Sequence, residues 1–366
     1  ACLVGSEMCI RDRAITNEHI KNLYAQIENE CQKPVPAEIQ CTGTLTQKDI
    51  YEAIIAFKND HPDIFWIKNT FSYYDYDGST YIELFYISSG TTLETQKEKF
   101  NEALNDFVNN ATMYSSEYER EKYVNDYIIS NCVYDDEAAY NNNTKGNVST
   151  AYGVLVDGKA ICEGYARAFQ LLCNKLGIEC VSIAGMTDNV GHEWNCAKID
   201  GNWYQVDVTW NDSQDDFSNY YYFNLTDEQM YSSHRADDLF DEIEPDNYNN
   251  DENLIGILYV PECNSTEYNY YNQTAPILYA FDEENDNTIS NALANSAVNG
   301  DNYFNIIVDD SLDFEDAYST LVQDGYVVNY IESANNILWG EVELDTSSYA
   351  YKNDTLRVIT IVLNYI

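Results

Sequence analysis

The chain of 366 residues is poor in basic residues, with 19 Lys and Arg against 62 Asp and Glu and a formal charge of −43. A protein this acidic is repelled by nucleic acids and by anionic membrane surfaces, so we expect neither as a partner. Long apolar runs are missing as well. No stretch approaches the ~18 residues of a transmembrane helix, and we expect no membrane span. The hydrophobic fraction of 45% nevertheless supports a buried core and excludes disorder of the whole chain.

Cysteine pairs in CxxC spacing are also absent, which argues against a zinc ribbon or a thioredoxin-like redox site. The ten cysteines are too few for a disulfide scaffold in a chain of this length. Most lie in apolar runs and are expected to be buried thiols, although Cys31 and Cys41 are close enough in the sequence to pair. The DYDG run at 75–78 and the acidic run at 282–286 are more simply a turn and a solvated loop than calcium sites. We therefore expect no cofactor and no metal.

The first residues lack an initiator Met, and the run LVGSEMCIRD at 3–12 resembles a translated sequencing adapter. We expect residues 1–13 to be a cloning or assembly artefact, and we exclude them from the fold. The natural N-terminus and any export signal are then missing, and the expected location is secreted or cell-surface. The remainder is expected to divide into a linker or remnant (14–44), an N-terminal α/β region (45–114), a core (115–250) and a C-terminal α+β region of unknown role (251–366).

Hydrophobic periodicity predicts an α+β chain. Helices are expected at 47–59, 92–110, 116–130, 162–176 and 313–324. Strands are expected at 64–74, 79–87, 179–186, 192–199, 202–210, 303–308, 327–331, 337–343 and 355–365. An Asp-Gly dipeptide joins the first two strands, and a second one joins the pair around residue 200, which is typical of tight hairpins.

Cys162 follows the run GKAI at 158–161 and opens a predicted helix. The N–H groups and the dipole at a helix N-terminus favour an anion there, which raises the thiolate fraction of a cysteine. Gly164 is expected to leave the thiol approachable. Taken alone, such a cysteine is more often a buried packing residue.

His192 and Asp207 strengthen the case for chemistry at Cys162. If Asp200-Gly201 is a two-residue turn, Ile199 faces Asn202, and His192 and Asp207 point to the same face of the hairpin as diagonal neighbours. A three-residue loop would reverse this parity. A thiol, an imidazole and a carboxylate in this order match a nucleophile, a base and a group that orients the base. Cys162 would attack an acyl carbon, His192 would carry the proton, and Asp207 would fix the imidazole tautomer.

These residues resemble the bacterial transglutaminase-like superfamily. The resemblance rests on YGVL at 152–155, GKAICEGYA at 158–166, GHEWN at 191–195 and DVTW at 207–210, and it covers about residues 115–235. It implies a transglutaminase-like, papain-like α+β core in which the helix with the cysteine packs on an antiparallel sheet, with smaller α+β flanking regions. It also implies a catalytic triad of Cys162, His192 and Asp207. Relatives often carry His-Asp where this chain has Asn125-Asp126, a position outside the triad.

The resemblance further implies a cysteine-dependent enzyme that acts on peptide or protein amide bonds through a thioester, either hydrolysing them or transferring the acyl group to an amine. Tyr152, Gly164 and Trp194 are candidate substrate-binding residues, although Tyr152 fits a core aromatic equally well. Acidic residues crowd the segment after Asp207, and if they line the cleft they favour cationic substrates. They are Asp212, Asp215, Asp216, Asp227 and Glu228.

Two other readings stay open at this stage. One is a catalytically silent binding or cell-surface scaffold, because a fold does not guarantee its chemistry. The other is carbohydrate binding near Tyr268, Tyr270 and Tyr271, which composition alone suggests.

Overall fold

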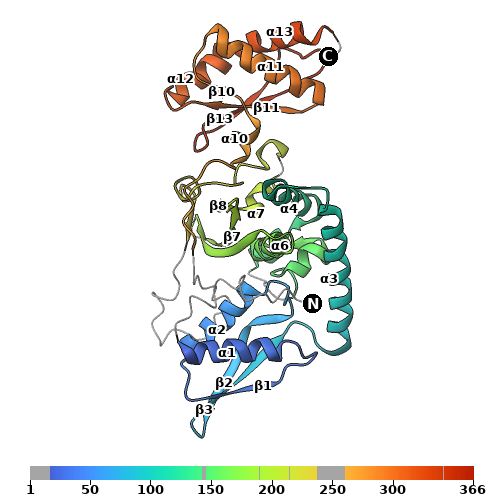
Figure 1. Cartoon of the computed structure of the whole chain (residues 1–366), viewed down its shortest axis with the longest axis vertical. Helices are drawn as coiled ribbons and strands as arrows, with labels where there is room; N and C mark the ends of the chain where they lie inside the picture. Colours follow the sequence, from blue (N-terminus) through green and yellow to red (C-terminus); the bar gives the residue numbers. More distant parts are fainter. Residues whose placement is uncertain (1–16, 142–145, 189, 214, 237–259, 341) are drawn as a thin grey trace. The chain divides into compact units, whose positions relative to one another are not determined.

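The structure is a computed structural model that describes residues 17–141, 146–188, 190–213, 215–236, 260–340 and 342–366 (Figure 1). The chain forms two compact units, one of residues 1–212 and 225–265 and the other of residues 213–224 and 266–366. The expected artefact at 1–13 lies outside the described residues, and the four domain boundaries drawn from the sequence stay predictions. No described helix is long and apolar enough to cross a membrane.

The first unit begins with two elements where the sequence predicted a linker. Helix α1 (Glu18–Glu30) buries Ile20, Leu23 and Ile27, and strand β1 (Glu38–Thr42) follows it. The apolar residues of α1 are spaced three and four apart, so the helical signal was present among the polar residues. The linker expected at 14–44 is therefore wrong for its described part.

A small antiparallel sheet with the order β1-β3-β2 completes this region. Helix α2 (Gln47–Asp60) starts at a capping box formed by Thr46 and Asp49, as its sequence favours. Strands β2 (Ile67–Tyr76) and β3 (Ser79–Tyr86) form the predicted hairpin, in which Tyr76 pairs with Ser79 across the tight turn.

The core of the first unit places helix α6 (Cys162–Lys175) against an antiparallel sheet with the order β8-β7-β6-β9. Its strands are β6 (Glu179–Thr187), β7 (Val190–Ile199), β8 (Asn202–Val206) and β9 (His234–Ala236). Helices α3 (Gly90–Ala111) and α4 (Glu117–Asn131) also contact α6. Every residue of α6 from Glu163 to Cys173 is buried, so only its two ends reach the surface. This is the predicted α+β core.

Shorter elements link these parts. They are β4 (Val133–Tyr134), α5 (Asp136–Tyr140), η1 (Gly153–Asp157), β5 (Lys159–Ala160), α7 (Val208–Asn211), η2 (Asp216–Ser218) and α8 (Asp227–Met230). The strand expected at 202–210 ends at Val206, because the Asp207 side chain accepts hydrogen bonds from the N–H groups of Thr209 and Trp210 and starts α7.

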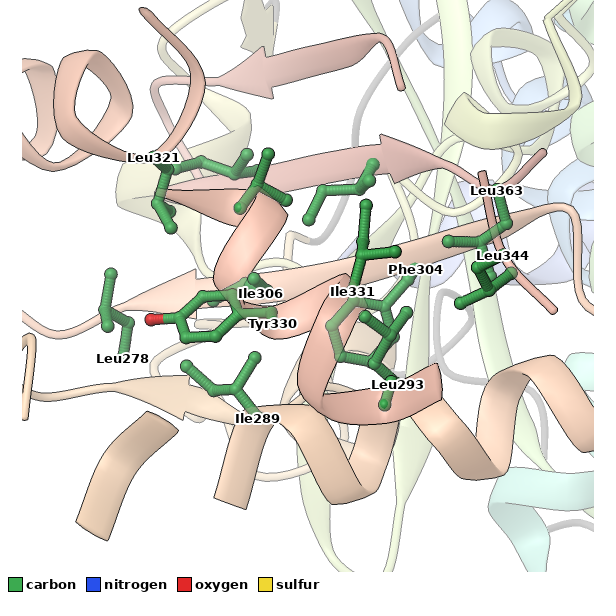
Figure 2. Packing of buried hydrophobic residues seen from close by; sticks show 14 of the residues in the cluster. Leu278, Ile289, Leu293, Phe304, Ile306, Leu321, Tyr330, Ile331, Leu344 and Leu363 are labelled. Carbon is green, nitrogen blue, oxygen red and sulfur yellow. The ribbon is translucent and has the colours of Figure 1, made fainter. Parts of the chain in front are cut away.

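The second unit packs helices on a four-stranded sheet with the order β10-β11-β13-β12. Its helices are α10 (Tyr270–Thr274), α11 (Glu283–Asn299), α12 (Phe314–Tyr318), η3 (Ser319–Gln323) and α13 (Val327–Leu338). Its strands are β10 (Ile277–Leu278), β11 (Tyr303–Val308), β12 (Ala350–Asn353) and β13 (Val358–Val362). Figure 2 shows Leu293, Ile306, Tyr330 and Ile331 meeting in this core.

The C-terminal predictions need three corrections. Helix α13 covers the strand expected at 327–331 and the first two residues of the strand expected at 337–343; its buried residues Val327, Tyr330, Ile331, Ala334 and Leu338 recur at helical spacing. The strand expected at 355–365 is confined to Val358–Val362. The acidic run at 282–286 is not a loop but the start of α11, where Asp282 accepts a hydrogen bond from the N–H of Asn285.

All eight cysteines among the described residues are free thiols, and seven of them are buried, as expected. Cys31 and Cys41 are not paired with each other. The eighth cysteine, Cys162, has a half-buried side chain.

Candidate active site

Cys162 is the first residue of α6, and the residue before it, Ile161, provides no side-chain cap for the helix. The middle turns of α6 are buried in the core, so the half-buried thiol stands at the N-terminal end of a helix that packing holds in place. The N-terminal dipole of α6 therefore acts on the sulfur without competition from a capping oxygen.

His192 and Asp207 are joined by a hydrogen bond of 2.6 Å between Nε2 and Oδ2. Their meeting follows from the hairpin register, in which Ile199 pairs with Asn202 and Asn195 with Val206. The two-residue turn expected from Asp200-Gly201 is confirmed. Asp200 and Gly201 both have positive φ, 46° and 90°, as this turn type requires.

The charges of this pair stabilise each other. Burial disfavours a charged ring at His192, but the carboxylate of Asp207 outweighs it and raises the His192 pKa to about 10. Burial likewise disfavours the Asp207 carboxylate, yet His192 and His234 hold the Asp207 pKa well below its usual range. An imidazolium at His192 is therefore stable over the neutral pH range.

The thiol of Cys162 lies close enough to the His192 ring to add to the rise of the His192 pKa. Since Nε2 faces Asp207, the nitrogen left for the thiol is Nδ1. The three predicted residues thus lie in the order sulfur, imidazole, carboxylate, with a hydrogen bond between the imidazole and the carboxylate.

Tyr134, at the end of β4, also reaches Cys162. Its hydroxyl lies close enough to the side chain and the backbone N–H of Cys162 for both to act on the Tyr134 pKa. Burial, followed by the charge of the nearby thiol, raises the Tyr134 pKa well above its usual range, so the hydroxyl stays protonated. Sequence reasoning missed this residue, because no spacing pattern ties an isolated strand of two residues to a helix start 28 positions later.

His234 is the second residue that sequence reasoning missed. Its Nε2 lies 2.9 Å from the same Oδ2 of Asp207, and its Nδ1 lies 2.8 Å from the Ser233 hydroxyl. The ring is buried on β9, which pairs with β6. The only sequence signal for His234 is that histidine is rare in this chain, which has four in all. His192 is therefore not the only imidazole near the carboxylate.

Among the described residues, His192, Asp207 and His234 form the group close enough to share a metal ion. The two N–O distances of 2.6 and 2.9 Å are those of hydrogen bonds. Ligands around tetrahedral zinc lie roughly 3.3 Å apart. The spacing therefore fits a carboxylate shared by two imidazoles and does not fit a metal site.

The three candidate substrate-binding residues are buried and have packing roles. Tyr152 is buried and packs on Phe65 with ring centroids 4.7 Å apart. This agrees with the alternative from the sequence, in which Tyr152 is a core aromatic. Trp194 is fully buried beneath the His192 ring and donates from Nε1 to Gln205. A Cβ at Gly164 would approach the carbonyl oxygen of Val148 to 2.5 Å, so this glycine allows close packing of α6 rather than access to the thiol.

Buried polar contacts hold the helix and the hairpin together. Arg167 on α6 lies 3.7 Å from Glu163 and 3.4 Å from Glu193, the residues that follow Cys162 and His192. Asn125 on α4 accepts a hydrogen bond of 3.0 Å from Asn211 in α7, the turn that Asp207 starts. Asn125 lies at the position where the resemblance leads us to expect His. Through Asn211 it contacts the turn that begins at Asp207, and it lies outside the triad.

The acidic residues after Asp207 are divided between the two units, with Asp212, Asp227 and Glu228 in the first. Asp212 accepts a hydrogen bond of 2.6 Å from Tyr165, and Asp227 accepts hydrogen bonds from Gln205 and from the Cys263 N–H. Asp215 and Asp216 belong to the second unit.

Comparison with known proteins identifies the family of the segment that contains the three candidate catalytic residues. The family model described as the transglutaminase-like superfamily matches residues 105–208, a range that includes Cys162, His192 and Asp207. Residues 105–208 are a transglutaminase-like domain. The transglutaminase-like domain predicted from the sequence is confirmed.

Two curated relatives match the chain over 167 residues. Kyphoscoliosis peptidase from Mus musculus is 29% identical, and the protein of the same name from Homo sapiens is 26% identical. Each match covers 42% of this chain and 24% of the relative, so the chain spans about a quarter of either protein's length. A crystal structure of a TGase is 16% identical, with a TM-score of 0.28, over 50% of this chain and 53% of that one.

Proposed function

We propose that the chain is a cysteine-dependent acyl-transfer enzyme that acts on peptide or protein amide bonds. The observation that carries the proposal is the half-buried Cys162 thiol beside the His192 ring, which is hydrogen-bonded to Asp207, at the N-terminus of α6. The family match and the name of the curated relatives, a peptidase, agree with it.

In the proposed reaction, the Cys162 proton is already held on Nδ1 of the His192 imidazolium, and the Cys162 sulfur attacks the amide carbonyl carbon as a thiolate. The Asp207 carboxylate stabilises this imidazolium. The imidazolium then protonates the leaving amine, and the C–N bond breaks to give a thioester on Cys162. Water attacks the thioester, His192 takes its proton and returns it to the sulfur, and a carboxylic acid leaves.

Tyr134 is proposed to stabilise the oxyanion together with the Cys162 N–H. Its hydroxyl already contacts that N–H and keeps its proton. A carbonyl oxygen arriving beside the N–H would find the hydroxyl as a second donor, which is what a tetrahedral oxyanion requires.

His234 is proposed as a positioning residue. With one bond from each imidazole on Oδ2 and two backbone N–H bonds on Oδ1, the Asp207 carboxylate has no freedom to rotate. That fixed carboxylate sets the orientation of the His192 ring.

The proposal also includes a preference for hydrolysis over transfer to amines, a neutral or cationic peptide substrate, and a secreted or cell-surface location. The acidic composition attracts cationic substrates, but it also keeps amines protonated and poor as nucleophiles. Partitioning of an acyl-enzyme at several amine concentrations and two ionic strengths tests the first two points. Dominant amide product at millimolar amine would overturn the preference for hydrolysis.

The alternative is a catalytically silent scaffold, and labelling with iodoacetamide separates the two. An active nucleophile predicts that Cys162 is alkylated at least about tenfold faster than the seven buried thiols in the folded protein, and that Asp207→Asn slows Cys162 specifically. The buried Cys173, on the same helix, provides the control variant Cys173→Ala, which should leave Cys162 labelling unchanged. Equal labelling rates in wild type and Asp207→Asn would favour the scaffold.

A further inference from the structure

The second unit contains a cavity of about 540 Å³. All of its lining residues belong to residues 213–224 and 266–366, so the cavity is separate from the site around Cys162. The lining comes from the η2 segment, α10, α11 and β11.

Aromatic rings form one wall of this cavity. Tyr220 and Tyr270 are stacked with centroids 3.8 Å apart and planes at 10°, and Phe217 lies 5.9 Å from Tyr303. Outside the lining, Tyr351 stacks on Phe217 at 4.0 Å and supports it from behind. Five aromatic residues line the cavity; Phe304 is buried, and the other four are half-buried, so they offer apolar ring surface that their neighbours hold in place.

Carboxamides also line the cavity. Asn295 and Asn299 lie one turn apart on α11 and are exposed, and Asn302 follows in the turn to β11. Asn305 on β11 joins them, with its Oδ1 accepting a hydrogen bond of 2.7 Å from Thr360. A carboxamide both donates and accepts hydrogen bonds, which is the capacity that matches a hydroxyl group.

The charge of the lining excludes anionic ligands. The described residues that line the cavity include Asp216 and Asp301 and no Lys, Arg or His. Asp301 accepts a hydrogen bond of 2.6 Å from Ser296. The last turn of α11 carries no basic residue, and the helix C-terminus adds partial negative charge. A phosphate or carboxylate would therefore be repelled.

We propose that this cavity binds a neutral carbohydrate. A sugar ring combines an apolar C–H face, which packs on aromatic rings, with hydroxyl groups that both donate and accept hydrogen bonds. The lining of this one cavity presents both chemistries. The composition-based expectation about Tyr268, Tyr270 and Tyr271 is narrowed to Tyr270, because Tyr271 is buried and only Tyr270 of the three lines the cavity.

The test is calorimetric titration of the full chain with cellotriose, maltotriose and tri-N-acetylchitotriose, each to about 10 mM. The test variant is Asn295→Ala/Asn299→Ala, which removes two exposed carboxamides. The matched control is Asn287→Ala/Asn291→Ala, which removes two exposed carboxamides from the same helix outside the lining. Thermal unfolding of each variant checks the fold, and Asn302→Ala serves as a second test if the double variant unfolds.

We expect saturable binding of at least one trisaccharide, weakened about tenfold or more in the test variant and unchanged in the control, as the loss of two hydrogen bonds predicts. Absence of binding by all three sugars would overturn the proposal. So would equal binding by the test variant and wild type. Spermidine is titrated alongside, and binding of spermidine without any sugar would assign the cavity to cations and contradict the proposal.

Discussion

Replacing Asp207 with Asn tests the electrostatic core of the proposed site, because the two side chains have the same shape. The backbone N–H groups of Thr209 and Trp210 bond to Oδ1 and will keep an oxygen in that place. The new amide NH₂ then faces Nε2 of His192. Two hydrogen-bond donors would point at each other if Nε2 kept its proton. His192 must move its proton to Nδ1, and the nitrogen beside Cys162 can no longer accept one.

The expected magnitude comes from the His192 pKa. A rise from the usual value near 6.5 to about 10 means that the imidazolium is stabilised by roughly 5 kcal/mol, largely by the Asp207 charge. Without that charge, burial dominates and the His192 pKa falls below its usual value. We expect kcat/KM to fall about 10³- to 10⁴-fold, the range that a barrier change of this size gives.

The pH dependence follows with a definite sign. In wild type the imidazolium persists until the pH rises through about 10, so the alkaline loss of activity lies there. Because the Asp207 pKa is lowered, its protonation contributes no loss at mildly acidic pH. His192 also stabilises the fold below about pH 6.5, and this contribution is lost as the pH rises through about 10. In Asp207→Asn the alkaline loss of activity moves to lower pH. The stabilisation of the fold by charged His192 is also lost.

Alkylation of Cys162 by iodoacetamide, followed by peptide mass spectrometry from pH 4 to 11, measures the effect without a known substrate. Circular dichroism checks that the variant is folded. The other cysteines are internal standards in the same digest. Superimposable rate–pH profiles for Cys162 in wild type and Asp207→Asn would refute the reasoning.

Three further variants have defined outcomes. Tyr134→Phe removes the hydroxyl beside Cys162 and should lower kcat about 10²-fold with little change in KM; Tyr140→Phe, at a ring 90% exposed, is the control, and an equal effect of both would remove the oxyanion role. His234→Phe removes one hydrogen bond to Asp207 and should lower kcat about tenfold, whereas His234→Gln, which keeps a donor, should retain more activity; identical losses in the two would make the role structural. Arg167→Met removes the buried guanidinium beside the carboxylates of Glu163 and Glu193 and should lower the free energy of unfolding by about 3–5 kcal/mol in a denaturant titration; a loss under about 1 kcal/mol would contradict it.

The fold of the core could be predicted from the sequence because its signals are local. Asp200-Gly201 sets a two-residue turn, and period-two alternation then places His192 and Asp207 on one face. The start of α6 at Cys162 is equally local, since Gly158 has a positive φ of 67° and the chain turns there from η1 into β5 before the helix.

The missed parts depend on contacts between distant segments. His234 reaches Asp207 only because β9 adds to the far side of β6, and no periodicity reports a strand of three residues. Tyr134 reaches Cys162 because β4 pairs with β5 in parallel, Tyr134 opposite Ala160.

In the C-terminal unit the error was of another kind. The β-branched residues Val327, Val328 and Ile331 favour a strand by residue type. The segment forms helix α13 instead, because a helix buries its apolar side chains against α11.

The most direct test of the central claim is a reaction with a peptide library, with and without a primary amine, followed by mass spectrometry of products and of the intact protein. The account predicts cleaved peptides, an acyl adduct on Cys162 trapped by acid quench, and neither in Cys162→Ala, while Cys173→Ala behaves as wild type. Wild-type turnover by Cys162→Ala would contradict the account.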